Sequence, residues 1–283
     1  MEKRLRLLLW GIPLIFYSHD ALAWGLYTHV YFGQLLVWAV PLLDPAFRRA
    51  SKRFPRLVMA GACLPDLALV GKTVGVESFR GTHDWESARA HLERARTDEE
   101  RALALGFASH LLVDVVAHNH FVPAHERLWF EGAMLSHMAS EWAMDAYIAR
   151  HLFETPGDLL LSQAEVRAYV EQFYGCTPAQ AGKALATLAR ADQFLRATRL
   201  PTGLLAAARR FDRRLVHRFD YYIQQTSVRL EQINRLVAGE TPFWQAELPC
   251  PKTKREELLA YSRHRVRGRL PVPEDFFRVV QGE

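Results

Sequence analysis

Residues 106–123 read GFASHLLVDVVAHNHFVP, an apolar run in which ionisable side chains recur at a regular interval. His110, Asp114 and His118 follow one another at intervals of four residues, so on an α-helix they lie along one face. Ionisable groups packed among leucine, valine and alanine cost free energy unless something compensates them, which disfavours the alternative of a solvated polar face. A bound cation compensates them directly, and imidazole together with carboxylate suits zinc. The stretch therefore predicts a buried helix that supplies ligands to a zinc ion.

A second pair with the same spacing follows in residues 135–145, LSHMASEWAMD. His137 and Glu141 form an HxxxE pair, which alone is a weak motif. It gains weight beside the first row, because two facing helices can enclose a metal site between them. Asp145 lies one turn further, where it would orient a ligating histidine or be an ordinary polar neighbour.

Two shorter segments offer further ligands. Asp66 follows the small-residue run AGAC over 60–63, which would let two backbones pack closely. His83 stands just before a predicted helix, and Asp84 beside it is assigned to helix capping. Each of these residues alone would more often belong to a turn or a helix cap, and their order relative to the other candidates gives them weight.

The N-terminal end has the features of a secretory leader. Its apolar stretch over 7–17 is too short to cross a bilayer, which takes about 20 apolar residues. Ala21 and Ala23 fit the small-residue positions of a cleavage site. Cleavage there would expose the α-amino group of Trp24, a nitrogen ligand that titrates near neutral pH. We therefore predict a signal peptide over 1–23 and a secreted or periplasmic protein, and disfavour an uncleaved interfacial anchor.

Helical periodicity dominates the rest of the chain, and alternating strand patterns are scarce. The predicted helices cover about 30–44, 86–121, 134–153, 163–174, 178–199, 201–218 and 220–238. Thr177 and Gln180 have the spacing of a capping box. Glycine and proline mark predicted loops at 71–72, 75, 81, 156–157 and 201. The fold class is predicted to be all-α, with one helical hydrolase domain over 24–245 and a C-terminal extension over 246–283.

The net charge and the cysteine content exclude few classes of function. The formal net charge is +5, and losing the leader, with three basic and two acidic residues, would make it +4. Basic residues concentrate from Arg209 onward, where they would attract anionic headgroups or nucleic acid, or form solvated helix faces and a basic tail. An oxidising compartment permits one disulfide, most plausibly between Cys176 and Cys250, leaving Cys63 free.

The order of these candidates resembles that of the zinc-dependent phospholipase C family. The resemblance covers about residues 24–145, and the opening WGLYTH with the HxxxDxxxH form looks especially like the catalytic domain of glycosylphosphatidylinositol-specific phospholipase D. It implies a multi-helix zinc-dependent phospholipase C-like domain with up to three zinc ions. It assigns one zinc to Asp66, His83, His110 and Asp114, another to Trp24, His29 and Asp114, and the last to His118, His137 and Glu141. The bacterial phospholipases place the middle histidine later, which would select His120 instead of His118.

This resemblance implies an exported phosphodiesterase that activates water for in-line attack on phosphorus. Asp66 is implied as the general base beside that water. The implied substrate is a phospholipid or another phosphodiester, with peripheral contact to a membrane. Both phospholipase C and phospholipase D outcomes stay open, as does the oligomeric state.

Two alternatives remain. Single-strand-specific zinc nucleases share the fold and much of the ligand order, but they usually end the last site with HxxxD where this chain has HxxxE. They stack bases on aromatic rings, a role that would fall to Tyr27, Trp85, Trp129 and Trp142. Nucleic acid is therefore the less favoured substrate. The other alternative is a non-catalytic, zinc-stabilised helical binding domain, which is disfavoured because structural zinc sites take four protein ligands and leave no open position.

Overall fold

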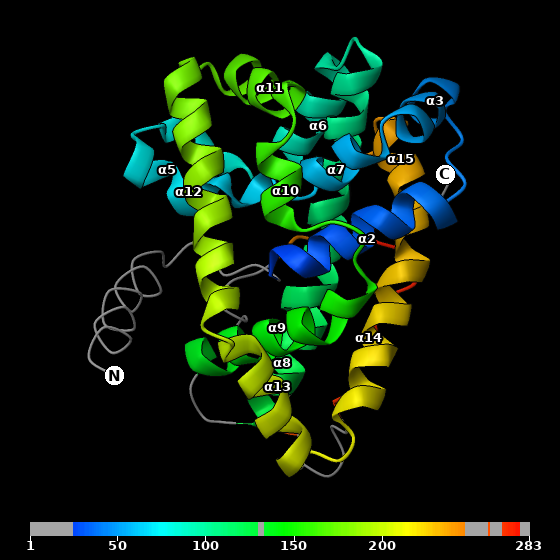
Figure 1. Ribbon diagram of the computed structural model, residues 1–283. Helices are drawn as coiled ribbons and strands as arrows, with labels where there is room; N and C mark the ends of the chain where they lie inside the picture. The colour runs from blue at the N-terminus through cyan, green and yellow to red at the C-terminus, as the bar shows by residue number, and fades with distance from the viewer. Residues whose placement is uncertain (1–24, 130–132, 247–259, 261–267, 278–283) are drawn as a thin grey trace, which may run out of the picture.

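The computed structural model describes residues 25–129, 133–246, 260 and 268–277, and within these ranges it contains helices and no strand (Figure 1). The predicted all-α class is therefore confirmed. The α-helices are α2 (Leu26–Ala39), α3 (Pro45–Arg53), α4 (Pro55–Gly61), α5 (Ala68–Val74), α6 (Trp85–Arg94), α7 (Asp98–Val116), α8 (Val122–Leu128), α9 (Ala133–Ile148), α10 (Pro156–Leu161), α11 (Ala164–Tyr174), α12 (Pro178–Ala197), α13 (Leu200–Phe211), α14 (Leu215–Arg229) and α15 (Ile233–Val237).

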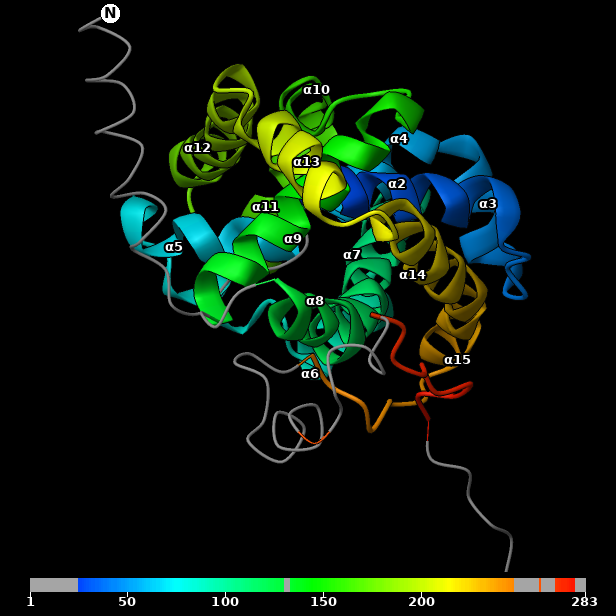
Figure 2. The ribbon, with the colours of Figure 1, turned by 90° about the horizontal axis from the view of Figure 1, so that it is seen from below.

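Helix α7 forms the axis of the core, with other helices packed around it (Figures 1 and 2). It contacts α2, α3, α4 and α6, and its residues from 102 to 116 are all buried. The run Asp98–Leu128 is long and apolar enough to cross a membrane, but its whole apolar window is buried inside the molecule. This burial is what a core helix requires, so the apolar stretch that carries His110 and Asp114 serves the interior of the protein.

Helices α4 and α7 approach each other closely through glycine. A Cβ atom on Gly61 would lie 2.2 Å from the carbonyl oxygen of Leu103, and one on Gly106 would lie 2.0 Å from that of Val58. Glycine alone leaves room for two backbones at this distance. The close packing predicted for the run 60–63 is therefore confirmed, and it brings the segment that carries Asp66 against α7.

The predicted single helix over 86–121 is wrong in its continuity, because α6 ends at Arg94 and α7 begins at Asp98. The break is a capping box in which the Thr97 hydroxyl accepts a hydrogen bond from the Glu100 N–H at 3.1 Å. The Glu100 carboxylate in turn accepts one from the Thr97 N–H at 3.1 Å. These bonds satisfy backbone donors that would otherwise be unpaired at the helix start, which stabilises a new helix at this point.

Other predicted boundaries are partly right. The capping box of Thr177 and Gln180 is present at the start of α12 and is confirmed. The predicted break at residue 219 lies instead over 212–214, between α13 and α14. Residues 71–72, predicted as a loop, lie inside α5; a Cβ atom on Gly71 would lie only 3.2 Å from Phe79 Cβ, so this glycine permits close packing instead of forming a turn.

Residues 268–277 form no helix and pack against α14 and α15. The Arg229 guanidinium donates from Nε to the carbonyl oxygen of Pro273 at 2.8 Å, and Phe276 and Phe277 are buried. Most of the predicted extension over 246–283 lies outside the described residues. So does Cys250, and its predicted disulfide with Cys176 stays a prediction.

Candidate metal centre

The predicted metal-ligating side chains within the described residues lie in one connected, mostly buried cluster. They come from α2, the 3₁₀ turn Pro65–Leu67, the loop before α6, α7, the π-helical turn Ala117–Phe121 and α9. Trp24 lies outside the described residues. Three groups have donor atoms within 4.8 Å of one another and could each hold a metal ion: His29, His110 and Asp114; Asp66, His83 and His110; His118, His137 and Glu141.

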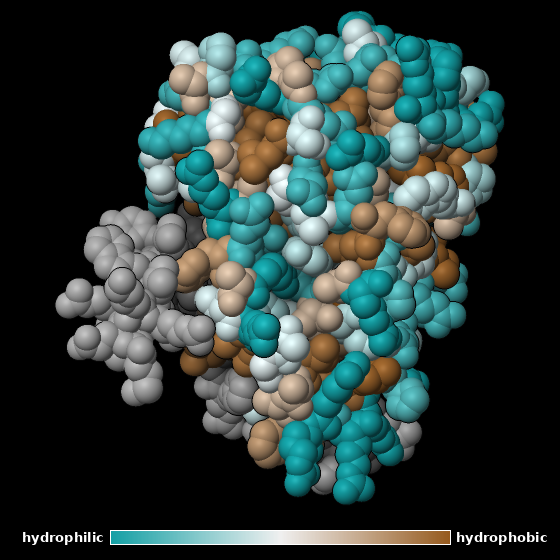
Figure 3. All heavy atoms as spheres, viewed as in Figure 1, coloured by the Kyte–Doolittle hydropathy of each residue, from teal (hydrophilic) through white to brown (hydrophobic). Residues whose placement is uncertain are grey.

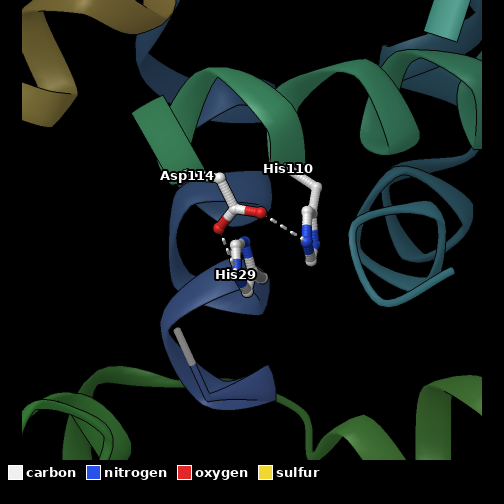
Figure 4. A group of neighbouring side chains, drawn as sticks. All are labelled: His29, His110 and Asp114. Atoms are coloured by element: carbon white, nitrogen blue, oxygen red, sulfur yellow. Dashed lines mark ion pairs between the residues drawn. The ribbon is translucent and has the colours of Figure 1, made fainter. Parts of the chain in front are cut away.

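Asp114 faces several histidines with its two carboxylate oxygens (Figure 4). Its Oδ1 lies 3.3 Å from His29 Nε2, and its Oδ2 lies 3.1 Å from His110 Nε2. The rings of His29 and His110 stack with centroids 3.5 Å apart, so both present a nitrogen to the same carboxylate. Oδ1 also lies 3.8 Å from His118 Nε2. Asp114 is therefore placed to be shared between metal ions.

The second group surrounds His83. Its Nε2 lies 3.3 Å from His110 Nε2 and 3.8 Å from Asp66 Oδ1. Two ligands on a tetrahedral zinc ion, each bonded at about 2.0–2.1 Å, lie about 3.3 Å apart. The side chain of His83 is 25% exposed while that of Asp66 is 3% exposed. This group therefore reaches solvent on the His83 side.

The third group joins the π-helical turn to α9. His137 Nε2 lies 2.9 Å from Glu141 Oε1, and the ring of His118 lies with its centroid 5.2 Å from that of His137. His120, the alternative ligand, belongs to none of the metal-binding groups found among the described residues, and its ring is 6.2 Å from that of Trp244. The geometry therefore favours His118.

The tautomer of His110 follows from its second nitrogen. His110 Nδ1 lies 2.8 Å from the carbonyl oxygen of Ala62. A carbonyl can only accept, so Nδ1 carries a proton. Burial lowers the pKa of His110, but Asp114 outweighs it and raises the pKa to about 8, so Nε2 is also protonated without metal and a metal ion would replace that proton. The contact of Nδ1 with a carbonyl is typical of metal-binding histidines. The run 60–63 thus supplies a carbonyl that orients a ligand, in addition to allowing close packing.

Burial sets the protonation states of the cluster. It lowers the pKa of His29 to about 4 and that of His118 to about 3, so both rings are neutral at pH 7, the form that binds metal. It raises the pKa of Asp66 and of Glu141 to about 7. Burial would also raise the pKa of Asp114, but the neighbouring histidines hold it well below its usual range. Asp114 is therefore the carboxylate that stays ionised.

The polar atoms of the cluster are left unsatisfied by the protein. Among the described residues, no contact of hydrogen-bond geometry is made by Asp66 Oδ1, either oxygen of Asp114, Glu141 Oε1 or either ring nitrogen of His29; the nearest polar groups to the Asp114 and Glu141 oxygens are other side chains of the cluster. Buried polar atoms without partners are costly and rare in folded proteins. Nitrogen and carboxylate oxygen are the donors that zinc takes. The residues therefore fit zinc, which would bind donor atoms that now face only one another.

Asp145 supports the centre in a way that the sequence did not predict. Its Oδ1 accepts hydrogen bonds from the Thr28 N–H at 3.0 Å and the Thr28 hydroxyl at 2.7 Å, and its Oδ2 pairs with Arg196. Within the described residues these bonds, rather than a bond to a ligating histidine, anchor Asp145. It fixes the first turn of α2, which carries His29. Thr28 and Arg196 were missed because no local pattern relates residues from helices so far apart in the chain.

Asp84 is the N-cap residue of α6 as predicted, although within the described structure its side chain makes no capping hydrogen bond. The remaining histidines were predicted to be surface or packing residues. His91 and His125 are buried, His151 and His217 are exposed, and His264 lies outside the described residues.

Comparison with known proteins agrees with this geometry. A family model described as zinc-dependent phospholipase C matches residues 28–188. The matched range contains every member of the three donor groups. Curated proteins and solved structures gave no significant match.

Proposed function

The chain belongs to the zinc-dependent phospholipase C family, and on this premise we propose that it is an exported phospholipid hydrolase with a trinuclear zinc centre. Membership of the family makes it a zinc-dependent hydrolase. The proposal adds the number of ions, the lipid substrate and the export. The observation that carries it is the position of Asp114, whose two oxygens face histidines of different donor groups.

We assign the ligands as the donor groups suggest. Asp66, His83, His110 and Asp114 would hold one zinc ion; the α-amino group of Trp24, with His29 and Asp114, a second; His118, His137 and Glu141 a third. The second site requires removal of residues 1–23, because only a free α-amino group can bind metal. The assignment therefore depends on export, and we propose the periplasm or the extracellular space as the compartment.

Bound zinc supplies Lewis acidity and lowers the pKa of water. The protein's own groups provide the rest of the chemistry. Asp66 is our proposed general base: its carboxylate accepts a proton from the water that attacks phosphorus, the P–O bond to the leaving oxygen breaks, and that oxygen takes up a proton and leaves as an alcohol. Burial raises the pKa of Asp66 to about 7 in the metal-free protein, and zinc bound to it would lower that pKa and keep the carboxylate ionised, as a base requires. The partly exposed His83 marks the side from which substrate would arrive.

Nuclease activity is the less favoured function. Trp85, one of the rings considered for base stacking, is only 8% exposed, and its Nε1 donates a hydrogen bond to the carbonyl oxygen of Trp244 at 2.7 Å. Tyr27 lies beneath the guanidinium of Arg196, 4.1 Å from its ring centroid. Rings engaged in this way are poor platforms for bases.

A purely structural role for the metal is also disfavoured. The group of His118, His137 and Glu141 offers three donors, and a closed structural zinc site takes four. Three protein ligands leave a position for water or substrate, as in catalytic sites.

Metal analysis tests the centre. Protein secreted with Trp24 as its first residue should contain about three zinc ions, one for each donor group. A version that retains residues before Trp24 should lose the zinc bound by the α-amino group and lose hydrolysis of phosphodiesters. Zero or one zinc in the processed protein would overturn the trinuclear assignment.

The products test the substrate and the bond cleaved. With phosphatidylcholine vesicles, phospholipase C chemistry releases phosphocholine and leaves diacylglycerol, whereas phospholipase D chemistry releases choline and leaves phosphatidic acid. We expect the first pair. Cleavage of single-stranded nucleic acid without lipid turnover would favour the nuclease, and full zinc occupancy without hydrolysis of any phosphoester would favour the binding domain.

A further inference from the structure

The start of helix α14 carries positive charge that would be stabilised by a bound anion. Its N-cap residue is Arg214, and within the described structure no side chain caps its first turn by a hydrogen bond. The first turn contains no acidic residue, and Arg218 follows one turn later. The N-terminal end of a helix carries partial positive charge and free N–H groups, so cations there are unfavourable and anions are favourable.

A cavity lies at this end of the helix. Its volume is about 300 Å³, and the described residues that line it are Arg214, His217, Arg218 and Arg269. Hydrophilic side chains gather at the lower end of the molecule in Figure 3, where Figure 1 shows the junction of α13 and α14. The cavity is of the size that small ligands occupy. Its lining is distinct from the residues of the metal centre.

Arg218, the buried residue of the cavity lining, lacks part of its hydrogen bonding. Arg218 is 3% exposed, and among the described residues its buried Nε has no hydrogen-bond partner. Its Nη2 pairs with Asp212, whose other oxygen accepts a hydrogen bond from the Arg214 N–H at 3.1 Å. Asp212 therefore compensates one guanidinium, while Arg214 and Arg269 add two more. A buried guanidinium with an unpaired N–H is costly unless a ligand completes it.

The backbone at Gly268 packs against Arg218, and the side chain of Arg269 forms part of the wall of this cavity. Gly268 has a φ of +62°, and a Cβ atom there would lie 1.9 Å from Arg218 Cδ, so glycine lets the backbone pass directly over Arg218. Arg269 follows at once; its Nη2 donates to the carbonyl oxygen of His217 at 3.4 Å, and its guanidinium lies 5.6 Å from the ring centroid of Tyr221. Arg269 is thus an exposed residue whose guanidinium these contacts hold at the rim of the cavity.

We propose that this cavity is a binding site for a phosphate group, separate from the metal centre. A phosphate dianion would accept from the guanidinium groups in charge-assisted hydrogen bonds and face the free N–H groups of the helix start. The group can belong to a small phosphorylated molecule in solution or to the headgroup of an anionic lipid. The inference does not depend on the reaction proposed for the metal centre.

The first test measures binding of inorganic phosphate to the zinc-loaded protein by calorimetry. The variants Arg214→Gln and Arg269→Gln should each weaken binding about tenfold, the loss expected for one hydrogen bond to a charged group. Arg213→Gln is the matched control, because Arg213 is exposed and adjacent but does not line the cavity among the described residues. Phosphate bound at the metal centre is common to all variants, so the difference between variants reports on the cavity. Unchanged melting temperatures without phosphate show that the variants are folded.

The second test distinguishes the source of the phosphate. Vesicles of phosphatidylcholine with and without phosphatidic acid are sedimented with each variant. A contribution of phosphatidic acid that Arg214→Gln and Arg269→Gln remove and Arg213→Gln keeps assigns the site to a lipid headgroup. Weakened binding of inorganic phosphate with unchanged sedimentation assigns it to a soluble phosphorylated molecule. If all four proteins bind inorganic phosphate alike and sediment alike, the proposal is wrong.

Discussion

A single buried carboxylate, that of Asp145, ties the first turn of α2 to α9 and α12. Thr28 donates to it from both its backbone and its hydroxyl, and Arg196 pairs with it from α12. A side chain on residue 25 would collide with it, since a Cβ on Gly25 would lie 1.9 Å from Asp145 Oδ2. Asp145 therefore positions the end of the chain that carries His29 without being a metal ligand itself.

Replacing Asp145 with asparagine should loosen this anchor. The change keeps the size of the side chain but removes the charge that pairs with Arg196, so we expect a loss of about 2 kcal/mol in the free energy of unfolding. Zinc bound near His29 should fall more than zinc bound by His137 and Glu141. Urea unfolding and metal analysis measure both effects. Asp84→Asn, at an exposed position, should change neither, and equal effects of the two variants would contradict the role of Asp145.

His91 is a buried histidine outside the metal centre. Its ring stacks on those of Phe107 and Phe173, with centroids 4.2 and 4.8 Å away, and its Nδ1 lies 2.6 Å from the Tyr169 hydroxyl. Burial, with a smaller contribution from Arg94, lowers its pKa to about 3. The folded protein therefore holds this ring neutral.

Because of His91, the protein should become less stable as the pH is lowered. Between pH 6.5 and pH 3 the unfolded chain binds a proton at this residue that the folded protein does not bind, so acid favours unfolding. Between pH 7 and pH 5 this proton uptake should lower the free energy of unfolding by about 2 kcal/mol. The variant His91→Phe should lose that part of the pH dependence, as measured by urea unfolding at both pH values. An identical pH dependence in the two proteins would contradict the assignment.

At the scale of elements, the π-helical turn Ala117–Phe121 sets how α8 is rotated relative to α7. The Val122 N–H donates to the Ala117 carbonyl oxygen in a π-helical bond. Pro123 has no N–H, so it cannot make the regular α-helical bond to the carbonyl of Asn119. Single π turns of this kind occur frequently at functional sites. Here the turn shifts the register of the helix between Asp114 and α8.

Replacing Pro123 with alanine should restore the regular helical bond. A regular helix would rotate α8, against which α9 with His137 and Glu141 packs, relative to the face of α7 that carries Asp114, so we expect the protein to lose about one zinc ion, that of the third donor group. Its thermal stability should be unchanged or higher, because alanine favours helix more than proline does. Metal analysis and thermal melting check this. Pro178→Ala, at the start of α12, is the control and should leave the zinc content unchanged.

The contact between α4 and α7 depends on the absence of a side chain at residue 106. Gly106→Ala would place a Cβ atom 2.0 Å from the carbonyl oxygen of Val58 and force the helices apart. We expect the free energy of unfolding to fall by about 2 kcal/mol. Gly203→Ala in α13, where a Cβ atom would have no neighbour within 4 Å among the described residues, should instead raise it by about 1 kcal/mol. Chemical denaturation distinguishes the signs, and a loss at both positions would contradict the packing argument.

At the scale of the whole molecule, the metal centre joins segments from across the first half of the chain. α2, α7 and α9 each contribute donor atoms to this cluster of ionisable groups. Without a cation the cluster is a set of buried, poorly satisfied charges. Zinc therefore acts on the stability of the fold as well as on the reaction.

Removing zinc with a chelator should destabilise the protein. Metal that binds the folded state alone, at about a thousand times its dissociation constant, contributes about 4 kcal/mol. We expect a fall of at least this order in the free energy of unfolding, restored when zinc is added back, as measured by denaturation with and without chelator. The variant His110→Ala should respond less to the chelator. A chelator that leaves the wild-type curve unchanged would contradict a structural contribution of zinc.

Much of the fold and the site followed from local patterns. The spacing of His110, Asp114 and His118, and that of His137 and Glu141, placed each set on one helix face, and the structure places them there. The break at Thr97 and the π turn before Pro123 were missed, although both carry local signals: a capping box, and a proline that lacks an N–H. The boundary near residue 212 was missed because the basic residues there continue a helical pattern.

The sequence by itself determined the helical class and the zinc chemistry and predicted the donor residues, because helix periodicity and ligand type are properties of short segments. The tertiary structure alone decided that Asp114 faces both His29 and His118, and that His118 rather than His120 joins α9. It alone brought Asp145 to Thr28, and Arg269 to the start of α14. Contacts of this kind depend on how the helices pack around α7, and no spacing along the chain encodes that packing.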